Sequence, residues 1–209
     1  TDFGTTGGMT SAATDFNAST GGTTDFGTTG GTTDMTGGAT DDGMTGGMTE
    51  VPDFSGDFLF VVATPLDPTL PFQYVASFDY FPSGFGGGTV DVELQPLALD
   101  TNSTTTPRTF FGAPLVFPAI PVTPDGTFAI PVGILNVPAQ TNPLFFIDAQ
   151  ANNVIFSIQV LDADDLCGTV TGFLVFPVAS PLDGTTIAAV RVADTSPAGL
   201  PVVFPVACP

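Results

Sequence analysis

Residues 72–80 read FQYVASFDY, and residues 90–95 read VDVELQ. Apolar and polar side chains alternate in both runs, and a period of two is typical of β-strands with one buried face. The connection at residues 82–88 contains one proline and four glycines, which turn the chain and cannot continue a helix. We therefore expect a β-hairpin over residues 72–95, with the rest of the domain packed against its aromatic face.

From residue 51 onward the chain consists of short apolar runs that prolines and glycines interrupt. No stretch shows a sustained helical period, and turn residues recur at roughly the 8–12-residue spacing of all-β domains. We expect about ten strands in an all-β fold, an antiparallel β-sandwich of jelly-roll or immunoglobulin-like topology. Besides the hairpin, the expected strands cover residues 57–63, 97–99, 110–117, 119–122, 127–130, 144–149, 154–161, 169–176, 185–193 and 200–206.

A low-complexity arm at residues 1–50 precedes the domain at residues 51–209. The arm holds 16 Thr and 13 Gly, and the octapeptide TDFGTTGG occurs at residues 1–8 and again at 24–31. Such a segment buries too little apolar area to offset its ordering entropy. Two interpretations stay open, a flexible or O-glycosylated spacer and an arm that docks along neighbouring subunits. The docking contacts would be single apolar residues that recur through the arm, namely Phe3, Phe16, Phe26, Met35 and Met44.

The charge of the chain excludes one class of partner. Asp and Glu number 21, Arg108 and Arg191 carry all the positive side-chain charge, and the net charge is −19. Phosphate backbones and anionic membrane surfaces repel such a chain, so we expect no nucleic-acid binding. No run of 18 uninterrupted apolar residues occurs, so we expect no membrane span.

Charged residues are scarce as well as unbalanced. They make up 11% of the chain, against roughly 25% in ordinary soluble domains. The exterior must therefore include considerable apolar area, and exposed apolar patches usually mark interfaces. We expect other copies of the chain to cover this area, in a homo-oligomer or homopolymer. The alternative is a monomer with a Thr-rich surface.

Cys167 and Cys208 are the only two cysteines. We expect an intrachain disulfide between them, closing a loop of about 40 residues and fitting an oxidising compartment. The alternative is a pair of unrelated buried thiols. A zinc site is not expected, because two cysteines without histidine do not complete a tetrahedral ligand set.

The densest acidic cluster offers one candidate cation site. Asp162, Asp164 and Asp165 present oxygen ligands of the kind that calcium prefers. A full calcium-binding loop pattern is missing, so a solvated turn is the alternative, and no other cofactor is expected. Asn17 and Asn102 match the N-glycosylation acceptor pattern, and glycans would help an apolar, charge-poor surface to stay soluble.

Catalytic machinery is not expected in this chain. A nucleophile needs a neighbouring base, usually His or Lys, and the chain contains neither. A carboxylate pair of the glycosidase kind stays formally open, but Trp, the commonest sugar-stacking residue, is absent.

Four segments of the domain resemble uncharacterised secreted domains of Gram-negative bacteria. These segments are residues 97–99 (LAL), 104–108 (TTTPR), 167–172 (CGTVTG) and 188–194 (AAVRVAD). In such domains a Thr/Gly/Asp-rich spacer often follows a lipid-modified cysteine, so the resemblance implies export and display at the cell surface, with a lipid anchor left open. The layout is also similar to that of subunits of extracellular bacterial and archaeal filaments.

These observations predict a non-enzymatic, extracellular or cell-surface structural protein. Its β-domain would self-assemble into a surface filament or layer, with the arm docked on neighbouring subunits. The alternative is a surface-anchored binding module that recognises a glycan or a protein from the end of a flexible stalk.

Overall fold

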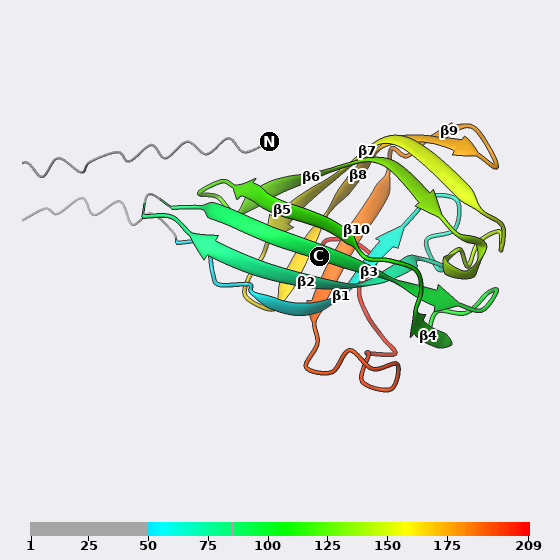
Figure 1. Ribbon diagram of the computed structural model, residues 1–209, viewed down its shortest axis with the longest axis horizontal. Helices are drawn as coiled ribbons and strands as arrows, with labels where there is room; N and C mark the ends of the chain where they lie inside the picture. The colour runs from blue at the N-terminus through cyan, green and yellow to red at the C-terminus, as the bar shows by residue number, and fades with distance from the viewer. Residues whose placement is uncertain (1–49, 85) are drawn as a thin grey trace, which may run out of the picture. The chain divides into compact units, whose positions relative to one another are not determined.

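The computed structural model describes residues 50–84 and 86–209 (Figure 1). The predictions made for the arm, which concern its five apolar contacts and Asn17, lie outside these residues. Within the described part the chain forms ten β-strands and one short 3-10 helix, η1. Their bounds are β1 Gly56–Ala63, β2 Phe72–Pro82, β3 Gly88–Leu99, β4 Pro107–Phe110, β5 Leu115–Val122, β6 Thr127–Val137, η1 Ala139–Thr141, β7 Ala149–Val160, β8 Asp165–Phe176, β9 Ser180–Pro181 and β10 Thr185–Arg191.

The predicted hairpin is confirmed by the pairing of β2 with β3. The two strands run antiparallel, with Phe78 opposite Val92 and Tyr80 opposite Val90. The alternation has the expected sense, because one parity of each strand is buried in the main apolar core. The buried residues of the hairpin are Tyr74, Ala76, Phe78, Tyr80, Val90, Val92 and Leu94.

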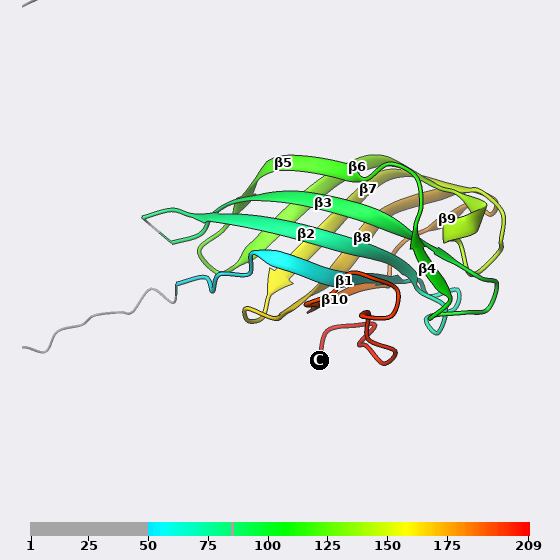
Figure 2. The same cartoon turned by 60° about the horizontal axis from the view of Figure 1, so that its bottom comes forward.

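The expected antiparallel β-sandwich of jelly-roll or immunoglobulin-like topology is wrong, because the sheet closes on itself. Strand β10 pairs with β1 on one side and with β8 on the other, opposite Gly168 and Cys167 among others. The order β10-β1-β2-β3-β5-β6-β7-β8 thus returns to β10, and these eight strands of the described chain form an antiparallel β-barrel (Figures 1 and 2). A single layer that closes buries its inner face without a second sheet. Because β10 pairs with both β1 and β8, neither of these two strands is left as a free edge.

Irregularities in the strands supply the curvature that closure needs. The register shifts in β6 on either side of Gly133, whose φ of 75° suits glycine, and it shifts again where β5 passes Ala119. A side chain at Gly168 would collide with the carbonyl oxygen of Ser157, so glycine lets β8 approach β7 closely. Alternation alone cannot reveal such bends, because a strand of a sandwich and a strand of a barrel share the same period of two.

One seam of the barrel is closed by side chains rather than by a ladder of hydrogen bonds. Strands β5 and β6 pair at one position, Val122 opposite Phe128. Prolines at positions 118, 121 and 131 remove backbone donors along the two facing strands. Apolar side chains of both strands pack on the core beside this seam, namely Leu115, Phe117, Val132 and Leu135.

Aromatic rings close one end of the barrel. Phe54 is fully buried, with its ring centroid 4.8 Å from that of Tyr80 and 5.8 Å from that of Phe128. Phe58 meets Phe78 edge-on with centroids 5.4 Å apart, in the arrangement that aromatic pairs prefer. These residues lie at the start of β1 and β6 and at the end of β2, so the opposite end of the barrel is formed by the other ends of the same strands.

Two predicted strands are absent, and the predicted strands at residues 110–117 and 119–122 have the wrong bounds, because β4 ends at Phe110 and β5 runs without a break from Leu115 to Val122. Residues 144–149 follow η1 as a turn, because the side chain of Asn142 accepts from the amides of Leu144 and Phe145 and donates to the carbonyl of Ile147. Residues 200–206 join no strand ladder among the described residues, because the prolines at 201 and 205 lack the donor that a ladder needs. They lie outside the barrel, beyond β1 and β10 (Figure 2).

Candidate functional site

A cavity of about 220 Å³ lies at the barrel end opposite the aromatic closure. Its inner wall comes from the barrel interior, with Val62 of β1, Phe156 of β7 and Val170 of β8 among its members. Eight-stranded barrels are just wide enough either to be filled by side chains or to hold one small ligand. Here the aromatic end follows the first solution and this end leaves space.

Connections between strands form the mouth of this cavity. Leu66, in the β1–β2 connection, and Phe145, in the β6–β7 connection, line the cavity and are 54% and 38% exposed. The β9 residues Ser180 and Pro181 contribute a third side, followed by Leu182. Apolar side chains that belong to both the cavity and the surface give an apolar molecule a continuous path from solvent to the interior.

Two hydroxyl groups in the cavity walls have no hydrogen-bond partner. Thr64, just after β1, is 8% exposed, and Thr185, at the start of β10, is 1% exposed. Both side chains line the cavity, and their Oγ1 atoms are buried without a partner in the described structure. A buried hydroxyl without a partner costs free energy, so a ligand oxygen that reached either group would supply a hydrogen bond that the protein lacks.

Tyr74 of β2 adds a third hydroxyl-bearing side chain to the cavity wall. Its ring meets Phe60 edge-on, with centroids 6.2 Å apart. Burial raises the pKa of Tyr74 to about 12, because the phenolate would lose its hydration. The phenol is therefore neutral at physiological pH and is able to donate a hydrogen bond.

Positive charge is engaged elsewhere in the described structure. Arg108 of β4 donates from Nε to Gln73 Oε1 at 2.9 Å and from Nη1 to the carbonyl of Pro201 at 2.8 Å. Arg191, at the far end of β10, forms an ion pair with Asp164 at 2.6 Å. The charged residue that lines the cavity is Asp183, which is exposed at the mouth.

The C-terminal segment, residues 194–209, straps the outside of the barrel. Leu200 packs over the outer face of β1 and β2, on Leu59, Val61 and Val75. The guanidinium of Arg108 lies 5.2 Å from the ring centroid of Phe204. Because Leu59, Val61 and Val75 are buried in the cluster that contains Leu200, β1 and β2 carry apolar side chains on both faces where the strap covers them.

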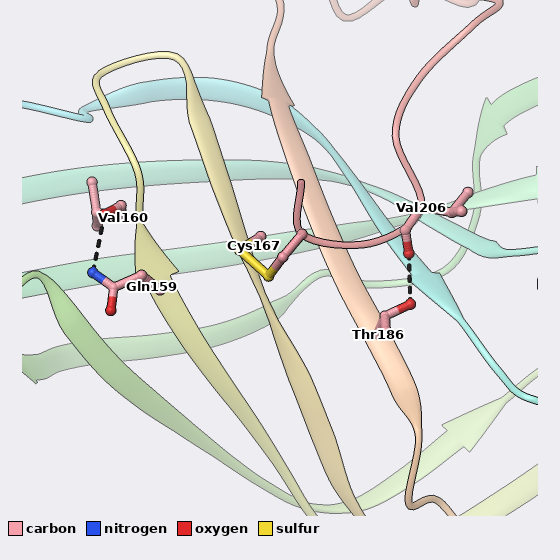
Figure 3. The surroundings of a disulfide bond; sticks show 6 residues. Gln159, Val160, Cys167, Thr186 and Val206 are labelled. Carbon is pink, nitrogen blue, oxygen red and sulfur yellow. Dashed lines mark hydrogen bonds between the residues drawn. A yellow bond between two sulfur atoms is a disulfide. The ribbon is translucent and has the colours of Figure 1, made fainter.

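The predicted disulfide between Cys167 and Cys208 is present and fastens this strap to β8 (Figure 3). Close by, the hydroxyl of Thr186 in β10 donates to the carbonyl of Val206 at 2.6 Å (Figure 3). A structural disulfide agrees with folding in an oxidising compartment.

The predicted calcium ligands form a turn that is occupied by protein contacts. Asp162 Oδ1 accepts from the amides of Asp164 and Asp165 at 2.8 and 2.9 Å, and Asp164 pairs with Arg191. Arg191 also donates to the carbonyl of Ala163 in the same turn. In the described residues no group of three acidic, His or Cys side chains is arranged to hold a metal ion, and calcium binding stays a prediction.

Asn102, the predicted glycosylation site in the described domain, lies exposed in the connection between β3 and β4. Its side chain is accessible, as a glycan acceptor must be, and its modification stays a prediction.

Sequence reasoning missed the cavity. Its wall residues belong to at least six separate elements, and Thr64 and Thr185 look like ordinary Thr residues beside apolar runs. The one available signal was the alternation that places Tyr74 on the buried face of β2, which marks a buried hydroxyl but not the empty space beside it.

Comparisons with known proteins found no match to a protein-family model, to a curated protein or to a solved structure. The resemblance to secreted Gram-negative domains therefore stays a prediction.

Among the residues that the structure describes, no helix combines the length and the apolar character needed to cross a membrane.

Proposed function

We propose that this protein is a non-enzymatic, exported binding module that holds one small apolar molecule in the cavity at the end of its β-barrel. The observation that carries the proposal is the cavity of about 220 Å³ with apolar walls and two unpartnered hydroxyl groups. A well-formed apolar pocket with a few polar groups is the usual form of a small-molecule site. This refines the binding-module alternative, with a small apolar molecule in place of a glycan or protein ligand.

The size of the cavity limits the ligand. An engineered apolar cavity of roughly 150 Å³ holds benzene, so about 220 Å³ suits a molecule of roughly ten non-hydrogen atoms. At an intermediate ligand efficiency, such a molecule would bind with a dissociation constant on the order of 10 μM.

Methyl heptanoate is a suitable first probe, because it is uncharged and has the expected size. Binding is measured by calorimetry and by tyrosine fluorescence, in which Tyr74 reports on the cavity and Tyr80 adds a constant background, because the chain has two Tyr and no Trp. Saturable one-to-one binding is the expected result. Failure of methyl heptanoate and of a ring compound such as naphthalene to bind would refute the proposal.

A filled cavity provides the matched test. Ala151 of β7 lines the cavity, so Ala151→Phe should occupy much of the space and abolish binding. Val154→Phe, on the same strand, is a second filling variant if the first overpacks the core. The control is Ala129→Phe on the exposed outer face of β6, which should bind like the wild type. Equal binding by the filling variants and the control would locate the ligand elsewhere.

Self-assembly into a surface filament or layer is the second candidate. It is supported by exposed apolar side chains on the outer face of the barrel, among them Val116, Ile134, Ile155 and Phe173. Prolines along the seam of β5 and β6 disfavour strand addition there, so assembly would use side-chain contacts. Sedimentation velocity over a hundredfold concentration range tests it, since a constant monomer mass throughout would remove this candidate.

A further inference from the structure

We infer, on the basis of the proposed function, that the cavity selects uncharged ligands bearing an oxygen acceptor, such as esters and ketones, and rejects ions of the same size and shape. The inference combines two independent features. One is the absence of a counter-ion for a buried ligand charge among the described wall residues, and the other is the set of unpartnered hydroxyl groups in the wall.

The first arginine is committed to the strap. Arg108 donates to Gln73 Oε1, to the carbonyl of Pro201 and, at 3.4 Å, to the carbonyl of Leu200. Its guanidinium also lies over Phe204. To reach a ligand in the cavity it would have to leave all these contacts and pass through the wall of the barrel.

The second arginine is too far away. Arg191 ends β10, and Thr185 begins the same strand at the cavity. Six residues of extended strand separate them by about 20 Å. Arg191 is further held by Asp164, by the carbonyl of Ser55 at 2.7 Å, and by the ring of Phe58 at 4.8 Å. The chain has no lysine or histidine to replace either arginine.

A ligand carboxylate in this cavity would therefore lose its hydration without gaining a positive partner. The exposed carboxylate of Asp183 at the mouth and the net charge of −19 add repulsion. A ligand ammonium group would also lose its hydration without gaining a buried negative partner. The one carboxylate of the described wall, that of Asp183, lies at the exposed rim, where water screens its charge.

An uncharged oxygen meets a different environment. Thr64 and Thr185 line the cavity and each hold a hydroxyl that lacks a partner, so that a turn of the side chain about its Cα–Cβ bond would let it donate to an ester or ketone oxygen. Tyr74 supplies a third donor from the neighbouring wall. Because the two Thr hydroxyl groups have no partner without ligand, a ligand bound to them would add hydrogen bonds and displace none within the protein.

Three probes of nearly equal size test the selectivity of the cavity at pH 7, with the full chain as the protein. They are methyl heptanoate, which is neutral, octanoate, which has the same heavy-atom count and a negative charge, and octylammonium, which is positive. The ester should bind at least about 100-fold more tightly than either ion. An ion that binds as tightly as the ester would overturn this inference and leave the proposed function standing, whereas failure of all three and of naphthalene to bind would end both.

Isosteric variants then test the role of the hydroxyl groups. Thr185→Val and Tyr74→Phe should each lower the affinity for methyl heptanoate by about 3- to 10-fold if that side chain donates to the ligand. Binding of propylbenzene, which carries no oxygen, should stay the same or improve in both variants. The control is Thr169→Val, at an exposed position of β8. If neither variant changes the ratio of ester to propylbenzene affinity, the hydroxyl groups do not recognise the ligand and the inference is wrong.

Discussion

The ring of Phe54 stacks on the ring of Tyr80, with centroids 4.8 Å apart and planes 27° from parallel. Phe54 precedes β1 and is fully buried, while Tyr80 is near the end of β2 and donates from its hydroxyl to the carbonyl of Gly87 at 2.7 Å. The stack therefore fixes the entry of the chain into the barrel and fills the end opposite the cavity. One end of the barrel is thus specialised for stability, and the other has space for a ligand.

Phe54→Ala should remove this closure. Loss of a fully buried aromatic side chain typically lowers the free energy of unfolding by about 3–5 kcal/mol. Urea denaturation measures the loss, and Phe81→Ala, at a site that is 54% exposed, should change the free energy by less than about 0.5 kcal/mol. The affinity for methyl heptanoate should be unchanged, because Phe54 lies at the other end. A loss below about 1 kcal/mol would contradict the assigned role.

Arg108→Met should loosen the strap at residues 194–209. The substitution leaves the carbonyls of Leu200 and Pro201 without their buried donor, at a cost of roughly 1.5–3 kcal/mol. Hydrogen exchange at the amide of Leu200, which donates to Ser196 in the folded chain, should become faster. Arg191→Met is the matched control, because it should disturb the turn at residues 162–165 and leave the Leu200 amide protected. Unchanged exchange in Arg108→Met would show that packing alone holds the strap.

Joint replacement of Cys167 and Cys208 by Ala should destabilise the fold without opening the cavity. The disulfide spans 41 residues, and the chain-entropy relation gives a loss of about 4 kcal/mol. Denaturation of the variant should match that of reduced wild-type protein. Ligand affinity should persist, because the strap covers the outer face of β1 and β2 and the cavity is inside. Loss of ligand binding at temperatures where the barrel stays folded would contradict this separation.

The burial of Tyr74 should make the stability of the fold fall at alkaline pH. Its pKa is about 12 in the folded state and near 10 when unfolded, so the stability it provides is complete below pH 10 and is lost as pH rises from 10 through 12. The loss reaches about 2 kcal/mol at pH 12 and its limit, above that pH, is about 2.7 kcal/mol. Ultraviolet titration should show a phenol step near pH 12 for Tyr74 and a separate step for Tyr80, whose pKa is raised by burial and by the charges of Glu50 and Asp53. In Tyr74→Phe the higher step should vanish. A normal ionisation near pH 10 for both phenols would contradict the burial of Tyr74.

The hairpin was predictable because its information is local. Alternation over residues 72–80 and 90–95 selects the buried face of two neighbouring strands, and turn residues lie between them. Closure was not predictable in the same way. It depends on the pairing of β10 with β8 and on bulges such as that at Gly133, and none of these changes the alternation in sequence.

Other features were predictable only in part. The presence of two cysteines, Cys167 and Cys208, predicted the disulfide. The strap that this bond fastens was predicted as a strand, because residues 200–206 are as apolar as the strands beside them. The cavity is space left between side chains, so its existence depends on how the walls pack. The unpartnered hydroxyl of Thr185 could not be predicted either, because its lack of a partner depends on residues that are close in the fold and distant in the sequence.

The most direct test of the binding proposal is a methyl-resolved NMR titration of the full chain with methyl heptanoate. Binding in the cavity should shift the methyl signals of Val62, Leu135 and Leu174, which line it, and leave those of Val116 and Val203 on the outside unchanged. Saturable shifts confined to the cavity set are the predicted result. Shifts confined to the outer set, or no shifts at millimolar ester, would contradict the claim that this barrel holds a ligand.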